Sequence, residues 1–342
     1  MSSKKKRKQK LPLAVKILIF LALILFFIAL FFYLALNAQL NKINRVDESD
    51  AERIPVSEET FEENYEEGDG ESAPSTLDLT PDSVKWAADQ NVMKDKDVAN
   101  ILIIGQDRRP GESRQRSDTM IVFSINKKSG RIILSSLMRD TYVQIPGYSD
   151  NRLNAAYQFG GMALLDETIE KNFAIHIDGN IEVDFDGFTA AIDTIGGIDI
   201  ELNEAEAEYM QQQGYSVTSG MNHLDGTTAL SYARNRSVGR SDWRRTERQR
   251  TVLSAVFTKM KDCDVSTLFA LTNDIFPLLT TDMDNTKLMG YVLEILGTGA
   301  TSAESHQIPA EGTYTPATIR NMEVLVPDLD ANRDYLKEHI YG

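Results

Sequence analysis

The sequence has few of the residues that several common kinds of protein site require. Cys263 is the only cysteine among 342 residues, which excludes an intrachain disulfide, a cysteine-rich zinc site and paired-thiol redox chemistry. The histidines are scattered without helical two-histidine spacing, so a histidine zinc site is not expected; they are His176, His223, His306 and His339. The chain also lacks a Walker-type phosphate loop, a dinucleotide-binding fingerprint and a nucleophile elbow. These absences direct attention to the carboxylates and guanidinium groups of the chain.

Positive charge is scarce outside the first residues of the chain. The formal net charge is -15, and residues 1–36 hold seven Lys and Arg with no acidic residue. Subtracting this +7 leaves -22 for residues 37–342. Such an acidic domain is unsuited to general nucleic-acid binding, which depends on neutralising phosphates with a spread basic surface. No nucleic-acid partner is expected, and arginines that cluster within the domain instead indicate a local anion site.

One segment has the length and composition of a membrane span. Residues 17–36 carry no charge and are long enough to cross the hydrocarbon core of a bilayer. The basic residues precede this run, so the positive-inside rule places the N-terminus in the cytoplasm. A cleaved signal peptide is the alternative, but the run is much longer than a usual signal-peptide core. We expect a basic cytoplasmic tail over 1–10, a single transmembrane helix over 11–36 in the cell membrane, and an extracellular domain beyond it.

An acidic segment follows the predicted span. Residues 47–71 contain twelve Asp and Glu against Arg53 alone. With so few apolar residues, this stretch cannot bury enough surface to fold, so we expect an extended tether. An acidic metal- or partner-binding tail is the less favoured alternative. The predicted organisation is an acidic extracellular linker over 37–96 and a folded domain over 97–342, in which residues 263–342 have no assigned role.

Strand and helix patterns alternate from residue 99 onwards. Strand patterns cover 101–104, 119–125, 131–137, 175–184 and 198–202. Helical patterns cover 153–173, with a possible interruption at Gly160-Gly161, and then 187–195, 203–212, 226–234 and 243–261. Asn203 and Asp225 are suitable N-caps for two of these helices. This order predicts an α/β layered fold with a mixed sheet.

Two carboxylates lie at the ends of neighbouring strands. Asp107 follows the first strand and Asp118 opens the second, so two adjacent strands could bring them to one sheet edge. Mg²⁺ is bound by a few carboxylates together with water and substrate phosphate. Each Asp could instead be an ordinary turn residue, but Arg108, Arg109 and Arg116 lie in the same loop, and this mixture of charges is unusual for a solvated turn.

Two arginines lie at the third strand and at the helix that follows it. Arg139 ends the strand beside Asp140, and a guanidinium at a buried strand end needs an anionic partner, which a structural salt bridge would supply as well as phosphate. Arg152 and Asn154 open the next helix, where unpaired backbone N–H groups favour anions.

A second set of polar residues flanks the start of the 243–261 helix. Arg234 and Arg236 end the preceding helix, whereas Arg245 and Gln249 extend the buried stripe of the longer one. A buried guanidinium and a buried amide both need partners. The other arginines of this helix region are expected to point to solvent, with Arg248 as a marginal candidate; they are Arg240, Arg244, Arg248 and Arg250. A basic nucleic-acid-binding helix is the competing interpretation, which the outward topology and the acidic charge oppose.

In sequence order these segments resemble the LytR-CpsA-Psr family of membrane-anchored cell-wall enzymes. The matching blocks are Ile103-Ile-Gly-Gln-Asp107, Arg116-Ser-Asp118-Thr, Ser136-Leu-Met-Arg139-Asp140-Thr-Tyr, Arg152-Leu-Asn154-Ala-Ala-Tyr157, Val183-Asp-Phe-Asp-Gly-Phe188, Gly196-Gly-Ile-Asp199, His223-Leu-Asp-Gly226, Ala229-Leu-Ser-Tyr232-Ala-Arg234-Asn-Arg236 and Arg245-Thr-Glu-Arg248-Gln249. The resemblance covers roughly Ala99 to Lys261. Met138 departs from the family, which usually has proline before the Arg-Asp pair. The resemblance implies a three-layer α/β/α sandwich with a central mixed sheet.

The resemblance also implies an activity. Members of the family transfer a glycopolymer, such as teichoic acid or capsule, from a polyprenyl diphosphate carrier to peptidoglycan. By position, Asp107 and Asp118 would hold Mg²⁺, orient the acceptor hydroxyl and act in catalysis together with Arg139. The residues that would bind the diphosphate are Arg116, Arg139, Arg152, Arg234, Arg236, Arg245 and Gln249. The alternatives are a non-catalytic membrane regulator that binds cell-wall lipids, and a diphosphatase that uses water as acceptor.

Overall fold

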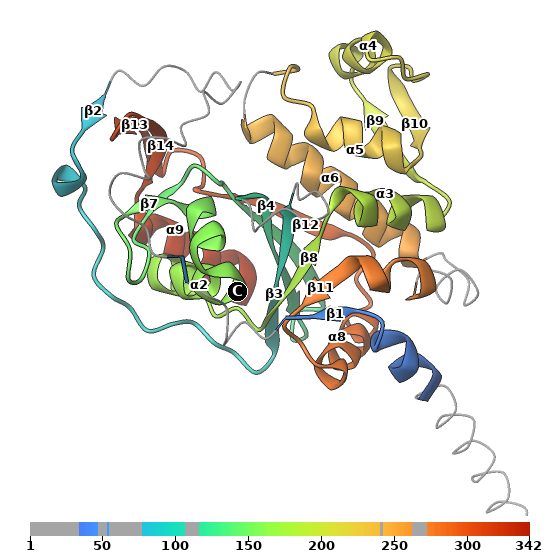
Figure 1. Ribbon diagram of the computed structural model, residues 1–342, viewed down its shortest axis with the longest axis horizontal. Coiled ribbons are helices and arrows are strands. Elements are labelled where there is room, and N and C mark those ends of the chain that lie inside the picture. Colours follow the sequence, from blue (N-terminus) through green and yellow to red (C-terminus); the bar gives the residue numbers. More distant parts are fainter. Residues whose placement is uncertain (1–33, 47–52, 55–76, 107–115, 240–241, 262–271) are drawn as a thin grey trace, which may run out of the picture.

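The computed structural model describes residues 34–46, 53–54, 77–106, 116–239, 242–261 and 272–342 (Figure 1). Its centre is a seven-stranded sheet with the strand order β1-β11-β8-β3-β4-β5-β12. The strands are β1 (Asn44–Arg45), β3 (Val98–Gln106), β4 (Ser117–Asn126), β5 (Arg131–Leu137), β8 (Gly179–Val183), β11 (Leu279–Thr281) and β12 (Ala303–Ile308). The pairs β1–β11, β3–β8 and β5–β12 are parallel and the others antiparallel, which confirms the predicted mixed sheet.

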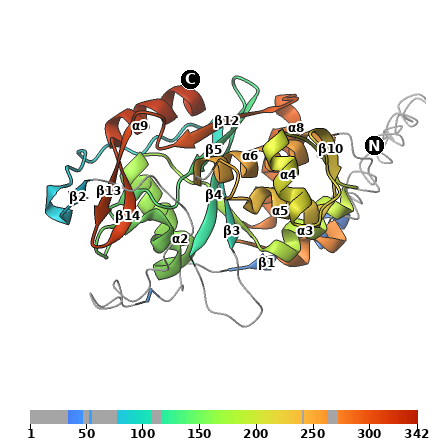
Figure 2. The ribbon, with the colours of Figure 1, turned by 90° about the horizontal axis from the view of Figure 1, so that it is seen from above.

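Helices cover both faces of this sheet (Figure 2). Because side chains alternate between the faces of a strand, Leu102 and Ile104 pack on one side against α2 (Leu153–Phe173) and α9 (Leu329–Leu336). Ile101 packs on the opposite side against α6 (Asp242–Lys261) and α8 (Asn285–Thr298). The result is three layers, helix on sheet on helix.

The longest helix of the first layer contains a break. In α2 the backbone leaves helical geometry at Gly160 and at Gly161, whose φ of 66° lies in the left-handed region that favours glycine. A Cβ on Gly160 would lie 2.6 Å from the Cβ of Leu164. The glycine pair therefore permits a break that the sequence pattern predicted as possible.

A smaller unit is inserted between β8 and α6. It comprises α3 (Phe185–Thr194), β9 (Ile198–Leu202), α4 (Glu204–Gln212), β10 (Gly220–Leu224) and α5 (Gly226–Arg234). The predicted N-caps are confirmed, since Asn203 accepts from the backbone N–H of Glu206 and Asp225 from that of Thr228. The unit has its own apolar cluster, which includes Val252 of α6. Helix α6 is therefore packed on two sides, by the sheet and by this unit.

The remaining elements are short or lie in a small second sheet. That sheet has the order β14-β13-β2 and comprises β2 (Asp78–Leu79), β13 (Tyr314–Ile319) and β14 (Met322–Pro327). A separate pair is β6 (Tyr142–Val143) with β7 (Asn151–Arg152). The short helices are η3 (Pro81–Ser83), η4 (Phe276–Leu278) and η5 (Lys337–Tyr341). Strands β1 and β2 both lie within the predicted linker 37–96 and pair with strands of the domain. The predicted boundary between linker and domain at residue 97 therefore separates strands that are paired in the structure.

Within the residues described here, no helix is both long and apolar enough to cross a membrane. The predicted transmembrane segment, 11–36, lies outside the described ranges except for residues 34–36.

Candidate functional site

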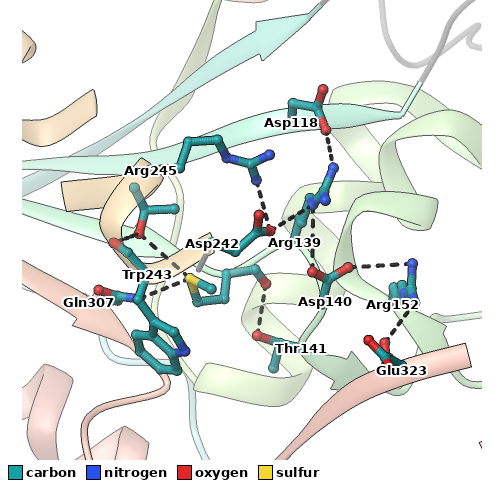
Figure 3. Close-up of polar contacts among 12 residues, drawn as sticks. Asp118, Arg139, Asp140, Thr141, Arg152, Asp242, Trp243, Arg245, Gln307 and Glu323 are labelled. Carbon is teal, nitrogen blue, oxygen red and sulfur yellow. Dashed lines mark hydrogen bonds and ion pairs between the residues drawn. The ribbon is translucent and has the colours of Figure 1, made fainter. Parts of the chain in front are cut away.

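Arg139 is the centre of a cluster of opposite charges (Figure 3). It follows β5, and the backbone N–H of Met138 is held 2.8 Å from the carbonyl oxygen of Ile308 at the end of β12. The Arg139 side chain then reaches the start of β4, where Nη1 donates to Oδ1 of Asp118 at 2.7 Å. Its Nε donates to Oδ2 of Asp242 at 2.9 Å and lies 3.5 Å from Oδ2 of Asp140. Three carboxylates therefore surround one guanidinium.

These carboxylates keep Arg139 charged in a largely buried position. Only 16% of its side-chain surface is exposed. Burial on its own would lower the pKa of Arg139, but the nearby charges of Asp140, Asp242 and Asp118 outweigh it and raise the pKa above the ordinary arginine value. Arg139 is a permanent cation at the edge of the sheet.

Asp242 is the residue that sequence reasoning missed. It lies in the first turn of α6, and its Oδ2 accepts both from Arg139 Nε and from Arg245 Nη2, each at 2.9 Å. Burial would raise the pKa of Asp242, but Arg245, Arg139 and Arg236 together hold it below the ordinary value. The three-residue spacing of Asp242 and Arg245 on a helix was the available signal, because such residues lie on the same helical face.

Arg245 is more deeply buried than Arg139 and less well satisfied. Its side chain is 3% exposed. Burial lowers the pKa of Arg245 to about 10, although Asp242 opposes the shift. Among the described residues, neither Nε nor Nη1 of Arg245 has a hydrogen-bond partner. A buried guanidinium with two donor nitrogens that make no hydrogen bond is suited to binding an additional anion.

Asp140 links the cluster to β7 and to the small sheet. Arg152 places Nη1 3.5 Å from Oδ1 of Asp140 and donates from Nη2 to the carbonyl oxygen of Glu323 in β14 at 2.7 Å. Burial raises the pKa of Asp140, against the effect of Arg139 and Arg152. Arg152 therefore belongs to the cluster, and its Nε finds no hydrogen-bond partner in the described part of the chain. Its role in binding diphosphate stays a prediction.

Other predicted residues lie at varying positions around this centre. Gln249 lies one turn beyond Arg245 on α6, and its Oε1 is buried and has no hydrogen-bond partner within the described ranges. Arg236 lies close enough for its charge to lower the pKa of both Asp242 and Arg245. Asp107 lies outside the described residues, so its place relative to Asp118 stays a prediction.

Two predicted diphosphate-binding residues make contacts away from Arg139. Nε of Arg116 donates to Oε1 of Gln158 in α2 at 3.1 Å. The Arg234 guanidinium lies over the Phe185 ring, 4.4 Å from its centroid, in contact with α3. Their proposed roles stay predictions.

The expectation that Arg248 and Arg250 point to solvent is wrong, whereas Arg244 is exposed as predicted and Arg240 lies outside the described residues. Arg248 donates 2.8 Å hydrogen bonds to Oε1 of Glu206 and to two carbonyl oxygens in the loop after α5. Arg250 donates to Oγ of Ser305 in β12 at 2.6 Å. The cause is the double packing of α6, which leaves only a narrow exposed face. Arg248 thereby fixes the loop that carries Arg236.

Comparison with known proteins agrees with this architecture. The LytR_cpsA_psr family model matches residues 58–338. The polyisoprenyl-teichoic acid–peptidoglycan teichoic acid transferase TagU of Oceanobacillus iheyensis is 36% identical over 233 residues, which cover 66% of this chain and 71% of that protein. TagU of Enterococcus faecalis is 35% identical over 190 residues, covering 54% of this chain and 61% of that protein. The second alignment thus spans less than two thirds of the relative.

Solved structures share the fold. Bacillus subtilis TagV is 29% identical, with a TM-score of 0.58 over 72% of this chain and 99% of that one. A TagT structure described as having bound octaprenyl pyrophosphate lipid is 23% identical, with a TM-score of 0.54 over 72% of this chain and 92% of that one. Because the TagT structure is only 23% identical to this chain, it supports a shared fold alone.

Proposed function

The chain belongs to the LytR_cpsA_psr family, and from this premise we propose that it is a phosphotransferase that moves a glycopolymer from a polyprenyl diphosphate carrier to peptidoglycan. Teichoic acid is the first candidate polymer, because it is the polymer in the names of the TagU relatives. We also propose that residues 11–36 anchor the protein by a single span, with the N-terminus cytoplasmic and the domain outside. The basic tail and the uncharged run of the sequence support this topology.

The observation that carries the proposal is the pair of guanidinium groups that share one carboxylate oxygen. Arg139 and Arg245 both donate to Oδ2 of Asp242. A phosphate oxygen in the place of this carboxylate oxygen would accept hydrogen bonds from both guanidinium groups. The Nε and Nη1 atoms of Arg245, which have no hydrogen-bond partner among the described residues, could donate to further phosphate oxygens. Arg236, whose charge acts on Arg245, and Arg152, which pairs with Asp140, add further positive charge. A diphosphate offers the number and charge of oxygens that such a set of donors requires.

The reaction then requires mainly positioning and charge stabilisation. The acceptor hydroxyl oxygen attacks the phosphorus next to the glycan and gives up its proton to water, the bond from this phosphorus to the bridging oxygen breaks, and polyprenyl phosphate leaves. Charge accumulates on the phosphoryl and leaving oxygens, where fixed guanidinium groups lower the barrier. Arg139 is suited to this role because its raised pKa keeps it charged. Asp118 lies beside Arg139 with 40% of its side chain exposed, within reach of an incoming hydroxyl.

Mg²⁺ is part of the proposal. Asp118 uses Oδ1 to accept from Arg139 while much of its carboxylate stays exposed, which suits an ion bound by one or two carboxylates, water and phosphate. Asp118 and the predicted partner Asp107 would hold it. When bound, the ion would neutralise phosphate oxygens. Among the described residues, no group of three or more His, Cys, Asp or Glu forms a metal site by itself, so substrate oxygens would complete the coordination.

The test uses the full chain in detergent micelles with a labelled polyprenyl-diphosphate-linked glycan, peptidoglycan fragments and Mg²⁺. Label attached to peptidoglycan, with release of polyprenyl phosphate, is the expected result. Label released only as free glycan phosphate would identify a diphosphatase instead. Binding of the carrier without any turnover would identify a lipid-binding regulator.

A further inference from the structure

Helix α8 is apolar on two faces, of which only one is covered. Leu288, Tyr291 and Ile295 pack into the apolar cluster beneath the central sheet. On the outer side Val292, Leu293 and Leu296 are 47%, 64% and 73% exposed. A helix with apolar side chains on both faces normally lies in an apolar environment. An exposed patch of aliphatic side chains is unfavourable in water and usually marks an interaction surface.

The outer face forms a regular stripe. Val292, Leu293 and Leu296 lie on one side of the helix, because Leu296 comes four residues after Val292 and three residues after Leu293. The helix carries two charged residues, and one of them, Glu294, is paired with Lys127 at 2.9 Å. This pairing limits the repulsion that a free carboxylate would exert on an anionic lipid surface. We call Val292, Leu293 and Leu296 the α8 stripe.

The start of α8 is tied to the end of the predicted membrane span. Nδ2 of Asn285 donates to Oδ1 of Asn37 at 3.0 Å and to Oδ1 of Asn41 at 2.6 Å. Asn37 directly follows Leu36, the last residue of the uncharged run. Figure 1 shows α8 and the helical residues 34–40 at the same end of the molecule, with α4 at the opposite end.

This attachment is built into the core. Leu40 and Ile43 are buried in the same apolar cluster as the inner face of α8, and β1 pairs in parallel with β11, the strand that precedes α8. The chain that would leave the bilayer is therefore fixed to the domain at α8. Since α8 has 14 residues and hence a length of about 21 Å, its stripe cannot lie far from the membrane surface.

We propose that the α8 stripe docks on the outer surface of the lipid bilayer in which residues 11–36 are anchored. This inference rests on the single-span topology proposed above. An exposed aliphatic stripe beside a membrane exit lies in the interface between headgroups and acyl chains, where its burial is favourable. Docking would hold the domain in one orientation and so fix the height of the Arg139 cluster above the carrier lipid. A second copy of the chain and the polyprenyl tail of the substrate are the competing occupants.

The first test measures where the stripe lies. In a Cys263→Ser background, a nitroxide is attached at Leu293→Cys or Leu296→Cys, with Glu208→Cys at an exposed position of α4 as the control. The full-length variants are reconstituted into phosphatidylglycerol–phosphatidylcholine vesicles, and collision with oxygen is compared with collision with a water-soluble nickel complex. We expect an oxygen-to-nickel ratio about tenfold higher at the α8 positions than at position 208, since oxygen partitions into lipid. A water-like ratio at all three positions overturns the proposal.

Two further outcomes identify the competitors and also overturn the proposal. Protection from both reagents, with spin–spin broadening, would indicate a second copy. Lipid-like access that appears only after the carrier lipid is added would indicate the substrate tail. None of these readings depends on catalysis, so failure of docking and failure of the proposed function can be told apart.

A second variant links docking to activity. Leu293→Ser with Leu296→Ser should leave the unfolding midpoint unchanged, because both side chains are exposed. Transfer from a carrier embedded in vesicles should fall about tenfold, whereas transfer from a water-soluble short-chain carrier should not change. An equal effect on both carriers, or an effect on neither, contradicts the proposed role.

Discussion

Replacing Asp242 by asparagine tests whether an internal carboxylate occupies the place of substrate phosphate. The substitution removes the charge that Arg139 and Arg245 share but keeps the size of the side chain. Arg139 retains Asp118 and Asp140, whereas Arg245, with only 3% of its side chain exposed, loses the carboxylate with which it forms an ion pair. Removing one partner of a buried ion pair typically costs about 3–5 kcal/mol. Because an amide oxygen still accepts hydrogen bonds, we expect a loss near the lower end, about 3 kcal/mol.

The same substitution should strengthen binding of diphosphate. In the wild type an incoming phosphate must displace the Asp242 carboxylate, and in the variant it replaces only a neutral amide. Denaturant unfolding, followed by tryptophan fluorescence with and without inorganic diphosphate, measures both effects. We expect diphosphate at a hundred times its dissociation constant to restore about 2.7 kcal/mol to the variant. At the same concentration it should stabilise the wild type less.

Glu247→Gln is the matched control on the same helix. Glu247 pairs with Arg244 at 2.7 Å, but both side chains are more than half exposed, so its loss should change stability by less than about 0.5 kcal/mol. If Asp242→Asn is as mild as the control, Arg245 is not held by this pair. If diphosphate stabilises the wild type more than Asp242→Asn, the carboxylate assists binding and does not compete with it.

Four further predictions concern the Arg139 cluster and the residues that support it. Arg139→Ala and Asp118→Ala should each abolish attachment of labelled glycan to peptidoglycan; attachment at the normal rate by both variants would show that the site is misassigned. Arg248→Ala should lose about 3 kcal/mol in denaturant unfolding, because Glu206 is left buried without its cation, whereas exposed Arg244→Ala should be near neutral. Because the pKa of Asp242 is lowered in the folded protein, the stability difference between wild type and Asp242→Asn should be complete above about pH 4 and decrease as the pH falls through the lowered pKa; a difference that increases as the pH falls below about 4 would contradict this. Chelation by EDTA should stop glycan transfer and added Mg²⁺ should restore it, and transfer that is insensitive to EDTA would remove the metal from the mechanism.

The central strands and several helix starts could be predicted from sequence because their signals are local. The apolar runs of β3, β4 and β5 are long enough to identify buried strands, and Asn203 and Asp225 cap their helices by accepting from backbone N–H groups only three positions away. Arg139, Arg152 and Arg245 could be nominated because guanidinium groups at buried strand ends or on apolar helix faces need anionic partners.

Features that depend on contacts between segments far apart in the sequence could not be predicted from local sequence patterns. Strands β1 and β2 have two residues each and exist only through pairing with β11 and β13, far along the chain. The spacing of the arginines of α6 is typical of a helix with one solvent-exposed face. The inserted unit buries Arg248 against Glu206, whereas β12 of the central sheet buries Arg250 against Ser305; both partners lie more than 40 positions away in sequence. The role of Asp242 depends on Arg139, which is 103 positions away in sequence.

The central claim is that Arg139 and Arg245 bind the same diphosphate, and calorimetric titration of a short-chain prenyl diphosphate tests it most directly. Wild type, Arg139→Gln, Arg245→Gln and the double variant are titrated in parallel, with the corresponding prenyl alcohol as the uncharged control ligand. Each single variant should bind about tenfold to a hundredfold more weakly, since a charge-assisted hydrogen bond contributes about 1.5–3 kcal/mol. The double variant should lose less than the sum of the two, because both side chains contact one anion. Unchanged affinity in either single variant, or strict additivity of the two losses, would contradict the shared site.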